Sequence, residues 1–372
     1  MDVNNSGTKL PYLLNFFFFL SVLYLHFYLI YNNSFNNKTM ADLTTKYLGL
    51  TLRNPLIAGS SGWTDNLQSL KQLEANGCGA VVLKSLFEEE IVRELKANMT
   101  RMTNDSFLYP ETVDFYEQNE FPKQSTDEYL TLIENAKKEL SIPVIASINC
   151  MTPGQWTYFP KKIEAAGADA LELNLFILPA DFNRSSAENE KVYFDIISAV
   201  KKQVKIPVSV KLSSYFSSFA KMMMDLSEAG ANGIVLFNRF YAPDIDIEKI
   251  EVTHGSILSH SSEMRLTLRW IAIMANRVKC DLAASSGVHD GHSFVKMMLA
   301  GATTVQIASA LYKNGPVCIH EMLGELTTWM DRKGFKSIDE CRGLLSQAHA
   351  DNPAVYERVQ FMKYFRGYKY IE

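Results

Sequence analysis

Short apolar runs alternate with longer amphipathic segments from about residue 40 onward. We interpret eight of these runs as buried parallel strands, because both of their faces are apolar. The expected strands are Pro55–Ala58, Ala80–Lys84, Pro143–Asn149, Ala170–Asn174, Pro207–Leu212, Gly233–Phe237, Asp281–Ser285 and Thr304–Ile307. The expected helices between them include Asn66–Asn76, Thr126–Leu140, Val192–Val204 and Phe219–Ala229. This alternation indicates an α/β fold, and eight strands favour a closed (β/α)8 TIM barrel over a doubly wound open sheet.

Further patterns mark the two ends of this barrel. Thr44–Asn54 alternates around Gly49, which predicts a small hairpin at the barrel floor. The connections Phe87–Ser125 and Phe240–Ser262 are longer than a helix needs, and both leave the carboxyl ends of strands. We therefore expect them to cover the active-site face.

The amino terminus differs from the rest of the chain. Leu10–Tyr31 consists mostly of Phe, Leu, Tyr and Ile without a formal charge, and it is long enough to span a bilayer. It is either a membrane anchor or the product of a start site assigned upstream of Met40, and it is left out of the fold prediction. We therefore expect an apolar extension (1–39), a barrel (40–316) and a helical extension packed on the barrel (317–372).

Charge and cysteine usage exclude several classes of function. The 37 Lys and Arg residues against 41 Asp and Glu give a net charge of −4, and no basic stripe stands out. This argues against nucleic-acid binding. The five cysteines are scattered and never form a Cys-x-x-Cys pair, which predicts no zinc or iron–sulfur site and a reducing, cytoplasmic compartment.

Two turns late in the barrel predict a phosphate site. Ser286-Gly287 follows the seventh expected strand, and Ala308-Ser309 follows the eighth and opens a helix. Both turns present backbone N–H groups at strand ends, where a dianion binds without any charged side chain. Strands 7 and 8 of a (β/α)8 barrel commonly hold a phosphate in this way.

Polar side chains also gather where the other expected strands end. They belong to Ser60, Lys84, Ser85, Asn149, Asn174, Lys211 and Asn238. A buried lysine is costly without a partner for its charge, so an anionic or polarisable ligand is expected, and asparagines supply paired donors and acceptors for a planar heterocycle. Two alternatives stay open: the lysines reach solvent, or one of them forms a Schiff base in a lyase or aldolase.

These residues lie in stretches that resemble the dihydroorotate dehydrogenases, chiefly class 1. The resemblance covers Met40 to about Pro316 and is carried by Asn54-Pro55, Ser60-Ser61-Gly62, Val82-Leu83-Lys84-Ser85, Glu172-Leu173-Asn174-Leu175, Val210–Phe216 and Ala300–Pro316. It implies an FMN-dependent barrel that oxidises dihydroorotate to orotate in pyrimidine biosynthesis. A small-molecule substrate and a homodimer are expected with it.

The resemblance also implies the role of each residue. Those implied to bind FMN are Gly59, Ser60, Lys84, Ser85, Asn149, Asn174, Lys211, Ser286, Gly287, Ala308 and Ser309. Those implied to act in catalysis are Lys211, Asn174 and Asn238. Lys211 matches the lysine beside the pyrimidine edge of the flavin, where a cation stabilises the anionic reduced ring.

The general base departs from the family pattern. After the fourth strand the family reads Asn-x-Ser-Cys-Pro-Asn, and class 1 enzymes use that cysteine as the base, whereas Ile177 stands here. An isoleucine cannot accept a proton. The remaining candidates are Ser185 and Ser186 on the same loop and Cys150 after the third strand.

Two further departures concern the substrate. The family's substrate loop maps loosely onto Glu117–Lys123, and Arg239 follows Asn238 where the family usually has Ser or Thr. The flavin half of the site is therefore kept while the substrate half has changed. This favours, as an alternative, a flavin oxidoreductase acting on a different small planar substrate; a barrel that binds FMN without turnover is another.

Overall fold

The computed structural model describes residues 41–99, 125–175, 177–239 and 242–357. The chain divides into residues 1–41 and 42–372, and almost all of the described residues belong to the second unit. The expected extension 1–39 and the expected substrate loop Glu117–Lys123 lie outside the described residues.

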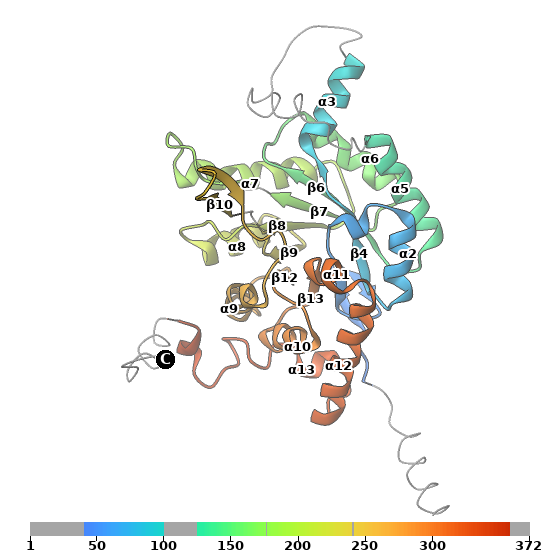
Figure 1. Ribbon diagram of the computed structural model, residues 1–372, viewed down its shortest axis with the longest axis vertical. Coiled ribbons are helices and arrows are strands. Elements are labelled where there is room, and N and C mark those ends of the chain that lie inside the picture. The colour runs from blue at the N-terminus through green and yellow to red at the C-terminus, as the bar shows by residue number, and fades with distance from the viewer. Residues whose placement is uncertain (1–40, 100–124, 176, 240–241, 358–372) are drawn as a thin grey trace, which may run out of the picture. The chain divides into compact units, whose positions relative to one another are not determined.

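Within the described ranges, eight parallel strands close into a barrel (Figure 1). In order around the ring they are β3 (Leu56–Ala58), β4 (Ala80–Val82), β6 (Val144–Cys150), β7 (Ala170–Leu175), β8 (Val208–Leu212), β9 (Gly233–Leu236), β12 (Asp281–Ser285) and β13 (Thr304–Ile307). β13 pairs in parallel with β3, which closes the ring. The predicted (β/α)8 barrel is confirmed, and the open sheet is excluded.

The second barrel strand is interrupted. β4 pairs with the start of β6 at Val81 and Val144, and the two-residue strand β5 (Leu86–Phe87) pairs with the end of β6 at Leu86 and Ile148. The chain between them carries the predicted Lys84 and Ser85. This break explains why the predicted strand, which extended to Lys84, ends earlier in the structure.

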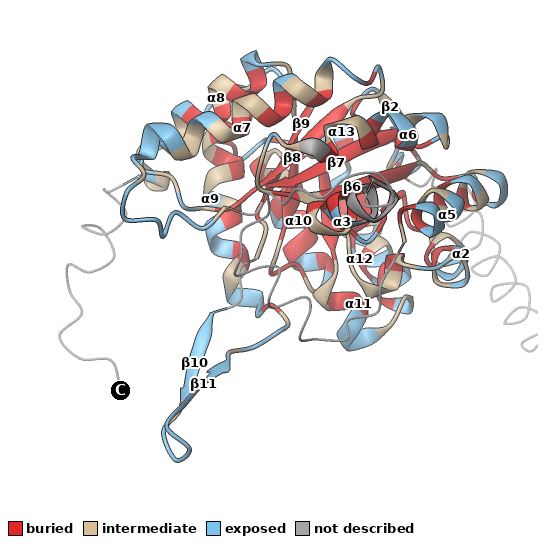
Figure 2. Cartoon of the chain, turned by 90° about the horizontal axis from the view of Figure 1, so that it is seen from above, coloured by how far each residue is buried: buried red, intermediate tan, exposed pale blue. Residues whose placement is uncertain are grey.

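Helices surround the barrel, and Figure 2 shows their outer faces exposed around a buried sheet. They are α2 (Leu67–Ala75), α3 (Glu88–Met99), α5 (Thr126–Glu139), α6 (Phe159–Ala165), α7 (Ser186–Lys201), α8 (Phe219–Glu228), α9 (Met264–Met274), α10 (Gly291–Ala300), α11 (Ser309–Asn314), α12 (Val317–Lys333) and α13 (Ile338–Cys341). The four predicted helices are confirmed. α7 begins six residues before the predicted start, because Ser185 and Glu188 form a capping box.

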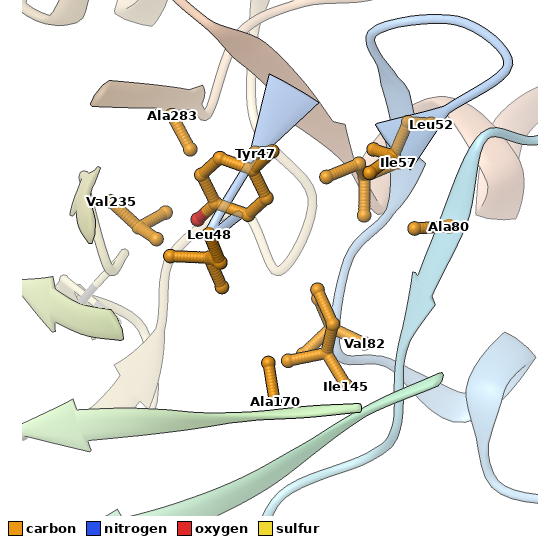
Figure 3. Packing of buried hydrophobic residues seen from close by; sticks show 10 residues of the cluster. All are labelled: Tyr47, Leu48, Leu52, Ile57, Ala80, Val82, Ile145, Ala170, Val235 and Ala283. Carbon is orange, nitrogen blue, oxygen red and sulfur yellow. The ribbon is translucent and has the colours of Figure 1, made fainter. Parts of the chain in front are cut away.

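The predicted floor hairpin is present as β1 (Thr45–Tyr47) and β2 (Leu50–Leu52). Tyr47, Leu48 and Leu52 pack with inward-facing residues of the strands, among them Val235 and Ala283 (Figure 3). The Leu48 N–H donates to a carboxylate oxygen of Asp281 at 2.7 Å. The hairpin fills the barrel at the amino ends of the strands, so a ligand site must open at the carboxyl ends.

Two features beyond the eight βα units were not predicted as such. The connection after β9 contains the antiparallel hairpin β10 (Pro243–Asp246) and β11 (Glu251–His254), which projects from the barrel in Figure 2. α12 packs along α10, so the start of the expected carboxyl-terminal extension belongs to the wall of helices. No helix in the described ranges combines the length and apolarity needed to cross a membrane.

Candidate active site

A cavity of about 660 Å³ opens where the strands end. The predicted residues that line it are Ser60, Lys211, Asn238, Ser286, Gly287, Ala308 and Ser309. They come from strand ends that are up to about 250 positions apart in sequence (Ser60 to Ser309 is 249). The closed barrel therefore brings the expected phosphate turns and the expected flavin lysine to one cavity.

The turn after β12 has the backbone conformation that an anion cup needs. Ser286 and Gly287 both lie in the left-handed region, with φ of 74° and 73°. A Cβ atom on Gly287 would lie 2.2 Å from the backbone nitrogen of Met264, so no other residue fits there without a shift of α9. Two successive residues in this conformation turn backbone N–H groups towards the same side.

Ser259, which the sequence did not single out, closes one side of this cup. Its N–H donates to Oγ of Ser309 at 2.9 Å, and its Oγ accepts from the Gly287 N–H at 3.3 Å. The ammonium group of Lys313 donates to its carbonyl oxygen at 2.8 Å. The long connection after β9 is thereby fastened to both phosphate turns.

Lys211 belongs to a buried polar network inside the barrel. Its Nζ atom lies 3.7 Å from Oε1 of Glu172 and donates to Oε1 of Gln306 at 3.4 Å. The triangle is closed by Nε2 of Gln306, which donates to Oε2 of Glu172 at 2.6 Å. Lys211 is 8 % exposed and Glu172 is fully buried, so each charge has its compensation within this network.

One buried side-chain atom of each of two asparagines lacks a hydrogen-bond partner among the residues that the structure describes. Asn149, Asn174 and Lys211 lie side by side at the ends of β6, β7 and β8. In the part of the chain that the structure describes, Oδ1 of Asn174 and Nδ2 of Asn238 make no hydrogen bond. An unpaired buried polar atom costs free energy, so these atoms point to a ligand.

Ser60 and Ser85 are linked to each other by hydrogen bonds. Ser60 Oγ lies 3.0 Å from Ser85 Oγ and accepts from the Ser85 N–H at 2.9 Å, and Ser85 Oγ lies 2.7 Å from Ser147 Oγ. The Gly59 N–H donates to the carbonyl oxygen of Ile307 at 2.8 Å. Lys84 does not line the 660 Å³ cavity; its side chain is half exposed, and its Nζ lies 3.8 Å from Asp65.

The family profile described as dihydroorotate dehydrogenase matches residues 42–330. The chain belongs to the dihydroorotate dehydrogenase family. The catalytic subunit of dihydroorotate dehydrogenase B (NAD(+)) from Thermoplasma volcanium is 27 % identical over 317 residues, covering 82 % of this chain and 99 % of the relative. The corresponding Methanocella arvoryzae protein is 30 % identical over 302 residues, covering 80 % and 95 %. A putative dihydroorotate dehydrogenase A (fumarate) from Aeropyrum pernix is 26 % identical over 313 residues, covering 82 % and 98 %.

Membership of the dihydroorotate dehydrogenase family confirms the predicted class of enzyme, an oxidoreductase with a small-molecule substrate and FMN as its cofactor. The residues present fit FMN, because the cavity combines the two turns, the buried Lys211 and the unpartnered Nδ2 atom of Asn238. The other residues predicted to bind FMN, Gly59, Ser85, Asn149 and Asn174, do not line this cavity. The Schiff-base alternative loses its support. Within the described ranges, no group of His, Cys, Asp or Glu side chains is placed to hold a metal ion.

The structure gives each candidate base a definite setting. Ser185 Oγ caps α7, accepting from the Glu188 N–H at 3.3 Å and donating to its carboxylate at 2.7 Å. Ser186 lines a smaller pocket of about 190 Å³ together with Ile177. Cys150 is fully buried, and burial, with Glu88 and Glu89 nearby, raises the pKa of its thiol well above the ordinary value. None of the three lines the 660 Å³ cavity.

Glu88, at the start of α3, is a titratable group that the sequence did not reveal. Its Oε2 accepts from the N–H groups of Met151 and Thr152 at 2.9 and 3.1 Å, which fixes the turn after β6. Burial raises the pKa of Glu88 from an ordinary value of 4.5 to about 7, against the effect of these hydrogen bonds.

Glu172 and Gln306 could have been found from strand alternation. Each lies two residues before a strand-end residue of the site, Asn174 and Ala308, and residues two apart on a strand share a face. Ser259 carried no such signal, because it lies in a long connection with no periodicity.

Proposed function

We propose that this chain uses FMN to oxidise the C5–C6 bond of dihydroorotate to orotate. The observation that carries the proposal is the arrangement of a buried, charged lysine and two unpartnered amide atoms at adjoining strand ends beside an anion cup. Bound FMN supplies a hydride acceptor, so the hydride from C6 and a proton from C5 must both leave the substrate.

Different residues of the site would bind the cofactor and orient the substrate. The backbone N–H groups of the two proposed phosphate turns would hold the FMN phosphate, and Ser60, which follows the neighbouring strand β3, would contact the cofactor beside them. Lys211 would place a positive charge near the flavin, which becomes more negative on reduction. Oδ1 of Asn174 and Nδ2 of Asn238 orient the planar ring of the substrate, which gives each amide the hydrogen bond that it lacks.

Loss of the C5 proton is the slow step in this proposal. Ile177 stands where class 1 enzymes have the basic cysteine, and an aliphatic side chain cannot accept a proton. The Ser185 hydroxyl is engaged in a helix cap, and burial keeps the Cys150 thiol protonated. We therefore expect dihydroorotate to reduce the bound flavin only slowly.

A different small planar substrate is the second candidate. Arg239 lines the cavity next to Asn238 and adds a cation to the substrate side. Arg239 and Ile177 are both departures from the family pattern, at the residue after Asn238 and at the place of the basic cysteine. Such a substrate would either be more acidic than dihydroorotate at the carbon that loses a proton, or need no proton transfer.

The test is purification of the chain from Met40, followed by an absorbance spectrum and anaerobic mixing with dihydroorotate. We expect a yellow protein with one non-covalent FMN per chain. A colourless protein that takes up no FMN on reconstitution would falsify the cofactor assignment. Orotate that perturbs the flavin spectrum without dihydroorotate reducing it would support a kept binding site with a lost base. NAD⁺ and fumarate, the acceptors in the relatives' names, are the first to try in reoxidation.

We further propose that the chain forms a homodimer through the β10–β11 hairpin. Ile245 and Val252 are direct cross-strand partners, and they are 65 % and 77 % exposed; Ile247 and Ile250 beside them are 78 % and 88 % exposed. A second copy would cover this apolar surface. Light scattering should give twice the chain mass, and Ile245→Asp with Val252→Asp should give the monomer mass with an unchanged flavin spectrum.

We place the reaction in the cytoplasm, because all five cysteines are free thiols. Fractionation of cells that express the full chain tests this. Recovery of the chain with membranes would instead support the anchor interpretation of residues 1–39.

A further inference from the structure

We propose that Glu172 is a positioning residue for Lys211, and that this ion pair sets how readily the bound flavin is reduced. The inference rests on the proposed place of Lys211 beside the flavin. It assigns a function to a buried carboxylate that neither touches the cavity nor belongs to the phosphate cup.

Glu172 contacts Lys211 on the side away from the cavity. Glu172 lies on β7, two residues before Asn174, and its side chain is fully buried in the barrel. Gln306 reaches it from β13, which is not a neighbour of β7 in the ring, so the network crosses the barrel interior. Lys211 and Gln306 line the cavity, and Glu172 lies behind them.

Oε2 of Glu172 is held by Gln306, while Oε1 is left for the lysine. In the described parts of the chain, Oε1 makes no hydrogen bond, and its polar neighbour is the Lys211 ammonium at 3.7 Å. That distance is too long for a hydrogen bond but short enough for a strong interaction between charges in a buried site. Gln306 thus fixes the carboxylate and bonds the ammonium as well.

Two consequences follow from this charge arrangement. A buried lysine without a counter-ion loses its proton readily, so removal of the Glu172 carboxylate should favour the neutral form of Lys211. The same carboxylate offsets part of the positive field that reaches the cavity. We therefore infer that Glu172 both holds the positive charge of Lys211 in place and weakens its effect on the flavin.

The other titratable groups around the pair do not replace Glu172. Tyr47, on the floor hairpin, lies near Glu172. Burial, with Glu172 and Asp281 nearby, raises the pKa of the Tyr47 phenol well above the ordinary value, so Tyr47 stays neutral. Burial, with Glu172 nearby, also raises the pKa of Tyr129. Asp281 accepts from the Leu48 N–H, and Arg239 across the cavity pairs with Glu263.

Glu172→Gln should therefore make the flavin's reduction potential depend on the protonation of Lys211. At pH 8 the variant should have a lower potential than the unmodified protein, close to that of Lys211→Met, because the unpaired lysine is neutral. On acidification towards pH 5 the lysine regains its proton without a compensating carboxylate, and the potential should rise past that of the unmodified protein. A purely structural role for Glu172 predicts no such crossing.

The experiment measures the potential of bound FMN from pH 5 to 9 in the FMN-loaded protein. It compares the unmodified chain, Glu172→Gln, Lys211→Met and the double variant, with the FMN dissociation constant and apoprotein thermal unfolding as checks on folding. The pH-dependent crossing should appear in Glu172→Gln and vanish in the double variant. Glu172→Asp, which keeps the charge, should show no crossing. If Glu172→Gln does not fold, Gln306→Leu replaces it in the comparison, because this variant keeps both charges. Gln306→Leu should shift the reduction potential without a crossing.

The outcomes separate the two levels of the proposal. If Lys211→Met leaves the potential unchanged, Lys211 does not lie beside the flavin, and the proposed function fails at that residue together with this inference. If Lys211→Met lowers the potential while Glu172→Gln runs parallel to the unmodified protein at every pH, only the inference is overturned. If Glu172→Gln does not fold, an unchanged reduction potential in Gln306→Leu overturns the inference about Glu172 as well.

Discussion

Nε of Arg239 donates to Oε2 of Glu263 at 2.8 Å, and Nη1 of the same guanidinium donates to the carbonyl oxygen of Ile257 at 2.7 Å. Two bonds to one planar group hold a cation at the edge of the cavity, next to Asn238. A fixed cation beside the expected substrate amide is suited to binding an anionic substrate.

Arg239→Ala should weaken the binding of orotate, measured by perturbation of the flavin spectrum, by roughly 10- to 100-fold, the range of one charge-assisted hydrogen bond. The stability loss should stay below about 1 kcal/mol, because the ion pair is partly exposed. Arg265→Ala is the matched control, since Arg265 lines the neighbouring pocket and not the cavity. Equal orotate affinity in the two variants would remove Arg239 from the substrate site.

Lys211→Met should slow flavin reduction more than it weakens FMN binding. The positive charge matters most as the ring becomes anionic, and losing it should raise the barrier by roughly 2–4 kcal/mol. Stopped-flow reduction and FMN titration give the two quantities separately. Lys221→Met, which removes an exposed lysine on α8, is the control. A reduction rate like that of the control would place Lys211 outside the reaction.

Ile177→Cys should accelerate reduction of the flavin by dihydroorotate. A positioned base typically contributes ~10²–10⁴-fold, and a thiol placed by this loop should recover part of that range. The gain should grow as the pH rises through the pKa of the new thiol, ordinarily ~8.5. Ile177→Ala opens the same space without a base and should give no gain. The idea of a missing base is lost if the unmodified chain already reacts as fast as the cysteine variant.

Gly287→Ala should abolish FMN binding at concentrations that saturate the unmodified chain. The new Cβ would collide with the backbone of Met264, which distorts the cup. Residue 287 also has a left-handed backbone, which by itself costs ~1–3 kcal/mol for a residue other than glycine. Gly315→Ala is a close control, because its φ is 69° and a Cβ there meets no atom within 4 Å. If both variants bind FMN equally well, the cup does not hold the phosphate.

Glu88 should make stability fall as the pH rises from 4.5 to 7. Its pKa is raised in the folded protein, so the native state holds a proton that the unfolded state has released, and stability decreases with pH in this window. The shift corresponds to about 3 kcal/mol. Glu88→Gln should therefore increase the free energy of unfolding, measured with urea, relative to the unmodified chain. The increase should be larger at pH 8 than at pH 5. A difference that does not change with pH would show that Glu88 titrates normally.

The barrel could be predicted from the sequence because each strand is apolar on both faces and each helix on one. Such patterns are local, and the count of eight strands sufficed to favour closure. The position of the two turns could be predicted for the same reason, since Gly287 and Ser309 follow recognisable strands; that they bind a phosphate stays a prediction. The interruption of the second strand between Val82 and Leu86 was not predictable, since apolar residues continue to Leu83.

Long-range polar partnerships were beyond the sequence. Glu172 and Gln306 are 134 positions apart, and Ser259 and Ser309 are 50 apart. No periodicity links such pairs, because their contact depends on closure of the ring and on the course of a long connection. The hairpin β10–β11 was missed because its strands are only four residues long and exposed, so they lack the apolar runs by which the buried strands were found.

The floor hairpin has a consequence for the order in which the chain can fold during synthesis. Leu48 leaves the ribosome early, but Asp281, whose carboxylate accepts the Leu48 N–H, is made 233 residues later. At ~5–20 residues per second, the interval is roughly 10–50 s. Throughout that time the side chains of Tyr47 and Leu48 have no completed barrel to enter. The first β-structure of the domain to be translated must therefore be among the last to be buried, and the nascent chain carries an exposed apolar segment for most of its synthesis.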